Sequence, residues 1–134
     1  MTTHVLIDAS GNVVAEFGSP QPDETPNYAV LQDDDPKVAA YRNPPPTEAD
    51  YVAAVQAMLD TKARERNYDN IMSACTYAAS TIAKFKAEGD ACLAWRDAVW
   101  AQCYTDLAAV QAGTMAQPTV GDFVASLPHL TWPS

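Results

Sequence analysis

The stretch Asn43-Pro44-Pro45-Pro46-Thr47-Glu48-Ala49-Asp50 marks the point at which the chain changes character. Three consecutive prolines favour stiff, extended backbone and cannot enter the interior of a helix. Thr47, followed by acidic residues in what would be the first turn, is typical of a helix N-terminus with Thr47 as the N-cap. The stretch therefore predicts an N-terminal module over residues 1–43, a proline connector over 44–46 and a second domain over 47–134.

The residues before the connector have the pattern of β-structure. Two apolar runs, Val5–Ile7 and Val13–Phe17, flank a short linker that contains Gly11 and Asn12, and this arrangement is typical of a β-hairpin. An isolated hairpin is only marginally stable, so a further element must pack beside it. We expect 28–31 to form a third strand and to complete a small antiparallel sheet.

An acidic run, Asp33-Asp34-Asp35, precedes Pro36. A cation site and a solvated loop are two possible interpretations of such a run. We favour a third, in which Asp35 is the N-cap and Pro36 the first residue of a short helix extending to Tyr41. The neighbouring carboxylates would also interact favourably with the positive end of that helix.

The residues after the connector have helical periodicity. Apolar residues at steps of three and four predict a first long helix that ends at about Arg66. We expect a second helix over about 70–79, capped by Asp69. A third should begin near residues 80–81 and end before Gly113, a suitable C′ glycine. Within it, Gly89 indicates either a break or a close contact with another helix.

The last segment completes the expected fold. The run 118–122 should cap a short helix that ends at about Ser126, and the apolar tail that follows includes Trp132. The predicted fold class is therefore α+β, with a small N-terminal antiparallel β module followed by a C-terminal three- to four-helix bundle.

The composition limits the classes of function and the location. The 134 residues carry 17 acidic and 8 basic side chains, a formal net charge of -9, which opposes binding to nucleic acid. There is no apolar run of about 20 residues and no secretory signal pattern at the start, so we expect no membrane partner. We interpret Cys75, Cys92 and Cys103 as free thiols, as in a reducing cytoplasm.

No group of residues predicts catalysis. The two histidines, His4 and His129, lie near opposite ends of the sequence, and no close spacing of histidines and cysteines suggests a metal site. The five glycines form no phosphate-binding pattern. A Cys103–His129 pair could in principle supply a nucleophile, but Cys103 falls on the apolar stripe of a helix. We therefore predict a protein that is not an enzyme, with no catalytic, cofactor or metal residues and no cofactor.

The aromatic residues are the better candidates for function. Trp95 and Trp100 are five positions apart, so both cannot point into one narrow helical stripe. One should be a core residue and the other should lie at the margin of the core, facing another element or another chain. Protein interfaces are enriched in such aromatic anchors. The candidate partner-binding residues are Trp100, Tyr104 and Trp132.

Several segments resemble a family of small bacteriophage tail-associated proteins, the tail-fibre assembly and tail accessory proteins. The segments that carry the resemblance are Tyr28 with 33–41, then 63–69, 73–75, 85–89, 95–100 and 127–133. The resemblance extends over most of the chain and is more distinctive in the helical part. It implies no catalytic residues.

What the resemblance implies is a bacteriophage tail-fibre accessory protein, which binds the fibre or a baseplate protein and assists its folding or attachment. It would act in the host cytoplasm during assembly and could stay in the virion tail. One alternative is a permanent structural subunit of the fibre or baseplate. A small metal-dependent hydrolase, suggested only by the acidic side chains, is the other. The sequence leaves open whether the chain forms an oligomer.

Overall fold

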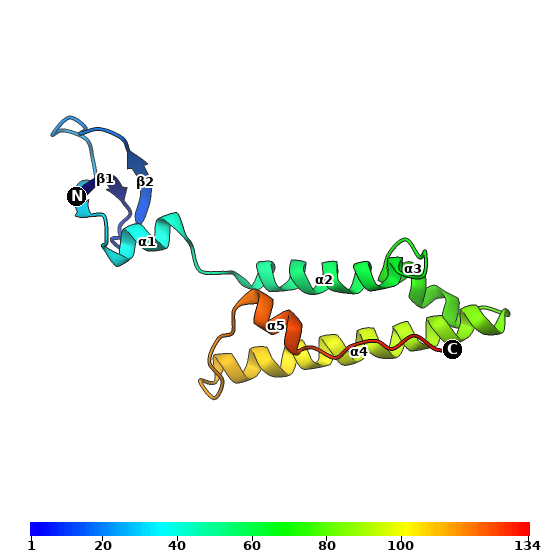
Figure 1. The fold of residues 1–134 in the computed structure, drawn as a ribbon. Coiled ribbons are helices and arrows are strands. Elements are labelled where there is room, and N and C mark those ends of the chain that lie inside the picture. The colour runs from blue at the N-terminus through cyan, green and yellow to red at the C-terminus, as the bar shows by residue number, and fades with distance from the viewer. The chain divides into compact units, whose positions relative to one another are not determined.

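The computed structural model describes residues 1–134 and confirms the α+β fold class (Figure 1). A three-stranded antiparallel sheet comes first and is followed by helices. The chain divides into two compact units, Met1–Pro45 and Pro46–Ser134. The division falls inside the run of three prolines, where no helix can continue from one unit to the next.

The first unit is built on a sheet with strand order β2-β1-β3. The strands are β1 (Thr2–Ile7), β2 (Val13–Phe17) and β3 (Tyr28–Gln32), and each includes a predicted apolar run. The central strand, β1, pairs antiparallel with both neighbours, so the third strand completes the hairpin as expected. The register of β1 with β2 shifts between Leu6 and Ile7, as at a β-bulge.

Helix α1 (Pro36–Arg42) covers one face of this sheet. Asp35 is its N-cap, and the Asp35 carboxylate accepts a hydrogen bond from the Lys37 backbone N–H at 2.8 Å. The acidic run before Pro36 therefore supplies a helix cap, as predicted. The fully buried side chain of Val38 packs against Val5 and Val13, and these three residues form the core of the unit.

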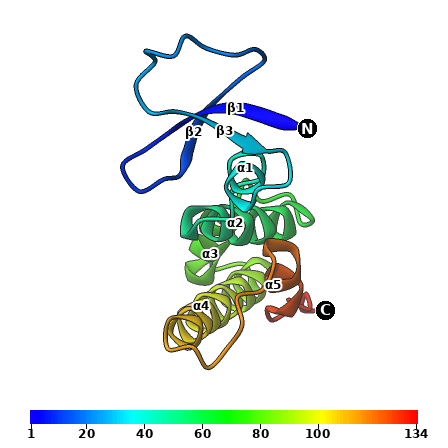
Figure 2. The ribbon, with the colours of Figure 1, turned by 90° about the vertical axis from the view of Figure 1, so that its left-hand side faces the viewer.

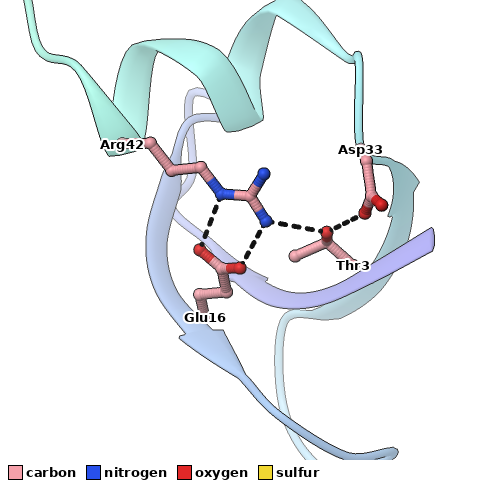
Figure 3. A network of polar contacts seen from close by, with 4 residues as sticks. All are labelled: Thr3, Glu16, Asp33 and Arg42. Carbon is pink, nitrogen blue, oxygen red and sulfur yellow. Dashed lines mark hydrogen bonds and ion pairs between the residues drawn. The ribbon is translucent and has the colours of Figure 1, made fainter. Parts of the chain in front are cut away.

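A polar network holds the end of α1 on the sheet (Figure 3). The Arg42 guanidinium donates to both carboxylate oxygens of Glu16, from Nη2 at 2.6 Å and from Nε at 3.2 Å. Arg42 Nη2 also donates to Thr3 Oγ1 at 3.2 Å, and the Thr3 hydroxyl donates to Asp33. The hydrogen bonds from Arg42 lower the pKa of Glu16 below its ordinary value. The network connects α1 with β1, with β2 and with Asp33, the residue that follows β3.

The second unit contains two long helices, α2 (Glu48–Arg64) and α4 (Ala83–Gln111), which run antiparallel (Figure 1). They are joined by α3 (Ile71–Thr76) and a 3-10 turn, η1 (Tyr77–Ala79). Helix α5 (Val120–Ser126) follows α4. In the view along the helices, α5 and the C-terminal segment lie on one side of the α2–α4 pair (Figure 2). This unit contains the helices of the predicted bundle.

The boundaries of the second predicted helix were partly wrong. Its N-cap is Asn70, whose side chain accepts from the Ser73 N–H at 2.8 Å, and not Asp69. The Ile71 N–H is also satisfied from another helix, because it donates to the Asp60 carboxylate at 3.0 Å. The α-helix ends at Thr76, and the 3-10 turn continues to Ala79. A contact from α2, which local sequence does not reveal, helps to fix this helix start.

The third predicted helix is unbroken, although it begins a few residues later than expected, at Ala83. Gly89 lies within it and marks a close helix contact, one of the two interpretations of this glycine. A Cβ atom at Gly89 would lie 2.2 Å from the Ala78 backbone nitrogen and 2.4 Å from the Tyr77 carbonyl carbon. Only a residue without a side chain allows α4 to approach the 3-10 turn this closely.

The core of the second unit lies where α2, α3, α4 and α5 meet. Its buried members are Val55, Leu59, Ala63, Tyr68, Ile71, Ala74, Cys92, Trp95, Val99, Phe123 and Leu127. Leu127 comes from the segment after α5, and the next residue, Pro128, accepts a hydrogen bond from Trp95 Nε1 at 2.8 Å. The C-terminal segment therefore belongs to the fold and is not a solvated tail.

Candidate functional site

The first wall of the candidate site is the N-terminal half of α2. Thr47 and Asp50 form a capping box: the Asp50 N–H donates to the Thr47 hydroxyl, and the Thr47 N–H donates to the Asp50 carboxylate. With its start fixed in this way, the helix presents Tyr51, Val52 and Val55 on one face. Val55 is buried, whereas 46% of the Val52 side chain is exposed.

The opposite wall is the C-terminal half of α4. Trp100, Tyr104 and Leu107 follow each other at steps of four and three, so they lie on one face of that helix. Trp95 is 7% exposed in the core, and Trp100 is only partly buried. This is the division between the two tryptophans that their five-residue separation predicts. Tyr104 is 72% exposed, an unusual position for a large aromatic side chain on a well-packed helix.

The floor and one end come from α5 and the loop before it. The Tyr51 hydroxyl donates to the Pro118 carbonyl at 2.6 Å and accepts from Gln117 Nε2 at 3.0 Å. The Tyr51 ring meets the ring of Phe123 edge to face, with centroids 5.6 Å apart. These contacts hold the loop and α5 against α2 and fix the side chains at this end of the site.

Together these elements enclose an apolar groove of about 350 Å³. We call it the α2–α4 groove, and its walls are mainly aliphatic and aromatic side chains of α2, α4 and α5. Two carboxylates, Glu48 and Asp106, also line it, but no lysine, arginine or histidine does. Neither carboxylate takes part in an ion pair. The groove therefore combines apolar walls with negative charge that has no intramolecular counterion.

The structure brings two of the three predicted partner-binding residues together. Trp100 and Tyr104 both line the α2–α4 groove, whereas Trp132 lies elsewhere. Trp132 is partly buried against the core, and its Nε1 donates to the Glu65 carboxylate at 3.0 Å. The Arg66 guanidinium lies over the Trp132 ring, 5.3 Å from the centroid. Contacts within the helical unit account for the position of Trp132.

A buried carboxylate, Glu88, has a structural explanation. Its side chain is almost fully buried, and Arg66 forms an ion pair with it at 3.5 Å. Burial, followed by the charge of Glu88, raises the pKa of the neighbouring Tyr68 to about 12. Arg66 therefore supplies the ionic partner that a buried carboxylate requires.

The residues considered for chemistry do not gather in one place. No group of three or more histidine, cysteine, aspartate or glutamate side chains could hold a metal ion. Cys103 lines the α2–α4 groove, and burial raises the pKa of its thiol, whereas His129 lies in a separate hollow. All three cysteines are free. Among the acidic residues of α4, Asp90 forms an ion pair with Lys86 at 3.2 Å on the surface.

Sequence reasoning missed half of the groove. It identified Trp100 and Tyr104, but it did not connect them with Tyr51, Val52 or Phe123. The available signal was the periodic apolar stripe of the first long helix, which has the same three- and four-residue steps as the stripe on α4. Periodicity identifies each stripe separately. Only the packing of α5 against α2 shows that the two stripes face a common space.

Comparisons with known protein families, with curated proteins and with solved structures find no match to this chain. None of its helices combines the length and apolar character needed to cross a bilayer.

Proposed function

We propose that the chain is a non-catalytic accessory protein that binds a partner protein in the α2–α4 groove. On the resemblance described above, the partner is a bacteriophage tail-fibre or baseplate protein. The chain would assist the folding or attachment of the fibre in the host cytoplasm during virion assembly. The comparisons supply no relative, so the identity of the partner rests on the resemblance alone.

The observation that carries the binding role is the exposed aromatic wall of the groove. Tyrosine and tryptophan supply large contact areas at low entropic cost and are enriched among residues that dominate binding energy. Tyr104 is 72% exposed beside Trp100 and Leu107, and Val52 faces the same groove with 46% exposure. A contiguous apolar surface of this kind is typical of an interaction site.

Co-expression with a tail-fibre protein encoded in the same genome tests the proposal. We expect the soluble yield of fibre protein to depend on this chain, and the two proteins to co-purify. Tyr104→Ala should reduce the co-purified fraction, because it removes an exposed aromatic anchor from the groove. Met72→Ala is the matched control, since Met72 is 70% exposed on α3, outside the groove.

Two results would count against the proposal. One is an unchanged fibre yield together with no association between the two proteins, and the other is an equal loss of association with both variants. The stoichiometry in purified particles then distinguishes the two modes of action. A fixed number of copies per virion would indicate a permanent subunit of the fibre or baseplate, and absence would indicate a transient assembly factor.

A further inference from the structure

The two walls of the α2–α4 groove have the geometry of a helix-binding site. On α2, Glu48, Tyr51 and Val55 follow each other at steps of three and four, and Val52 lies beside them. On α4, the equivalent series includes Tyr104 and Leu107. Two antiparallel helices that present such stripes to one space provide a groove into which the apolar face of another helix can pack.

The charges at the groove limit the kind of helix that fits. Glu48 and Asp106 are its only charged lining residues, and neither has a cationic partner in the chain. A helix with acidic side chains beside its apolar stripe would place like charges together. A helix with lysine or arginine in those positions would supply the missing counterions, which favours its binding and speeds its association.

We infer that the α2–α4 groove binds an amphipathic helix whose apolar stripe is flanked by lysine or arginine residues. This inference rests on the proposed function, because it takes the groove as the partner's binding site. It adds the secondary structure and the charge of the segment that binds there.

A second copy of the chain does not meet this requirement. Five of its eight basic side chains already form ion pairs within the chain, namely Arg42, Lys62, Arg66, Lys86 and Arg96. Two chains that each carry a net charge of -9 also repel each other at low salt. Charge complementarity therefore points to a basic partner and away from self-association through this groove.

A pair of synthetic peptides tests the inference on the purified full-length chain. Both are fluorescein-labelled helical peptides with the same leucine stripe; one has lysine and the other glutamate at every polar position. Fluorescence anisotropy gives the Kd of each peptide. We expect saturable binding of the lysine peptide and no detectable binding of the glutamate peptide. Added salt should weaken the binding because it screens the attraction.

Two charge-removing double variants separate the groove from the overall charge. Glu48→Gln with Asp106→Asn should weaken binding of the lysine peptide about fivefold, as expected for two charges at the rim of an interface. Asp23→Asn with Glu24→Gln removes the same charge from an exposed loop of the first unit and should leave the Kd unchanged. Equal weakening by both double variants would overturn the inference, because net charge alone would then explain binding.

Tyr104→Ala tests the apolar wall of the groove. It should raise the Kd of the lysine peptide about tenfold, because it removes an aromatic anchor. Equal affinity for the two peptides, or no binding of either, would overturn the inference. So would a dimer in sedimentation that Tyr104→Ala dissociates, since the groove would then bind a second copy.

A negative result in the peptide assay can be distinguished from a negative result in the co-expression experiment. Peptide binding without fibre association would leave the inference in place and remove the proposed partner. Fibre association that depends on Tyr104 but not on Glu48 or Asp106 would keep the proposed function and overturn the basic character of the bound helix.

Discussion

Replacing Gly89 with alanine tests whether the close contact between α4 and the 3-10 turn organises the helical unit. The added Cβ would lie 2.2 Å from the Ala78 nitrogen and 2.4 Å from the Tyr77 carbonyl carbon, where ordinary contact begins at 3.4 Å. Both neighbours are backbone atoms, so no side chain can rotate away to make room. The helix and the turn would have to separate by about 1 Å.

The size of the effect follows from two opposing contributions. Overpacking of a well-packed site costs about 1–3 kcal/mol, occasionally more, and this contact lies at the severe end because backbone must move. Alanine regains about 1 kcal/mol of helix propensity relative to glycine. We expect a net loss of about 2 kcal/mol in the free energy of unfolding. For a unit of this size, that loss lowers Tm by about 8–16 °C.

Thermal unfolding followed by tryptophan fluorescence measures this loss directly. All three tryptophans, Trp95, Trp100 and Trp132, lie in the helical unit, so the signal reports on that unit alone. Gly121→Ala is the control, because no atom lies within 4 Å of the position its Cβ would take; its Tm should stay unchanged or rise slightly. A Gly89→Ala protein as stable as the wild type would refute the reasoning.

The further predictions concern three single residues. Tyr51→Phe removes the hydrogen bond to the Pro118 carbonyl and should lower the free energy of unfolding, measured by urea titration, by about 1 kcal/mol. An unchanged urea midpoint would show that this hydrogen bond does not stabilise the fold. Cys92 should react with a thiol reagent more slowly than Cys75 in the native protein, since it is fully buried and burial raises its pKa to about 11. Because the Cys92 pKa is raised in the folded state, the free energy of unfolding should fall as the pH rises above the ordinary thiol pKa of 9.0. The Cys92 thiol ionises first in the unfolded chain, which favours unfolding. The Glu16 carboxyl should titrate below 4.5 in NMR spectra and return towards that value in Arg42→Met, so its contribution to stability is complete above pH 4.5 and is lost as the pH falls.

The parts of the fold that were predicted correctly depend on neighbours in sequence. Asp35 and Thr47 act as N-caps because each side chain reaches a backbone N–H only two or three residues away. The strands follow from short apolar runs bounded by turn residues. Such features could be predicted because the interacting groups lie in one stretch of chain.

The parts that were missed depend on distant residues. The start of α3 involves Asp60 of α2, and the choice between the two interpretations of Gly89 depends on how closely Ala78 approaches it. In the candidate site, Trp100 and Tyr104 were found from the pattern on one helix. Their opposite wall was not, because the pairing of Tyr51 with Phe123 arises only when α5 packs on α2.

The order in which the ribosome makes the chain gives the C-terminal segment a particular importance. Leu127 is part of the helical core, and Trp95 is hydrogen-bonded to Pro128, so α2 and α4 lack part of their packing until these residues have been synthesised. The first unit has its own core in Val5, Val13 and Val38, and all three residues are synthesised before Pro45. The core residues of the first unit therefore leave the ribosome while the core of the helical unit is still incomplete.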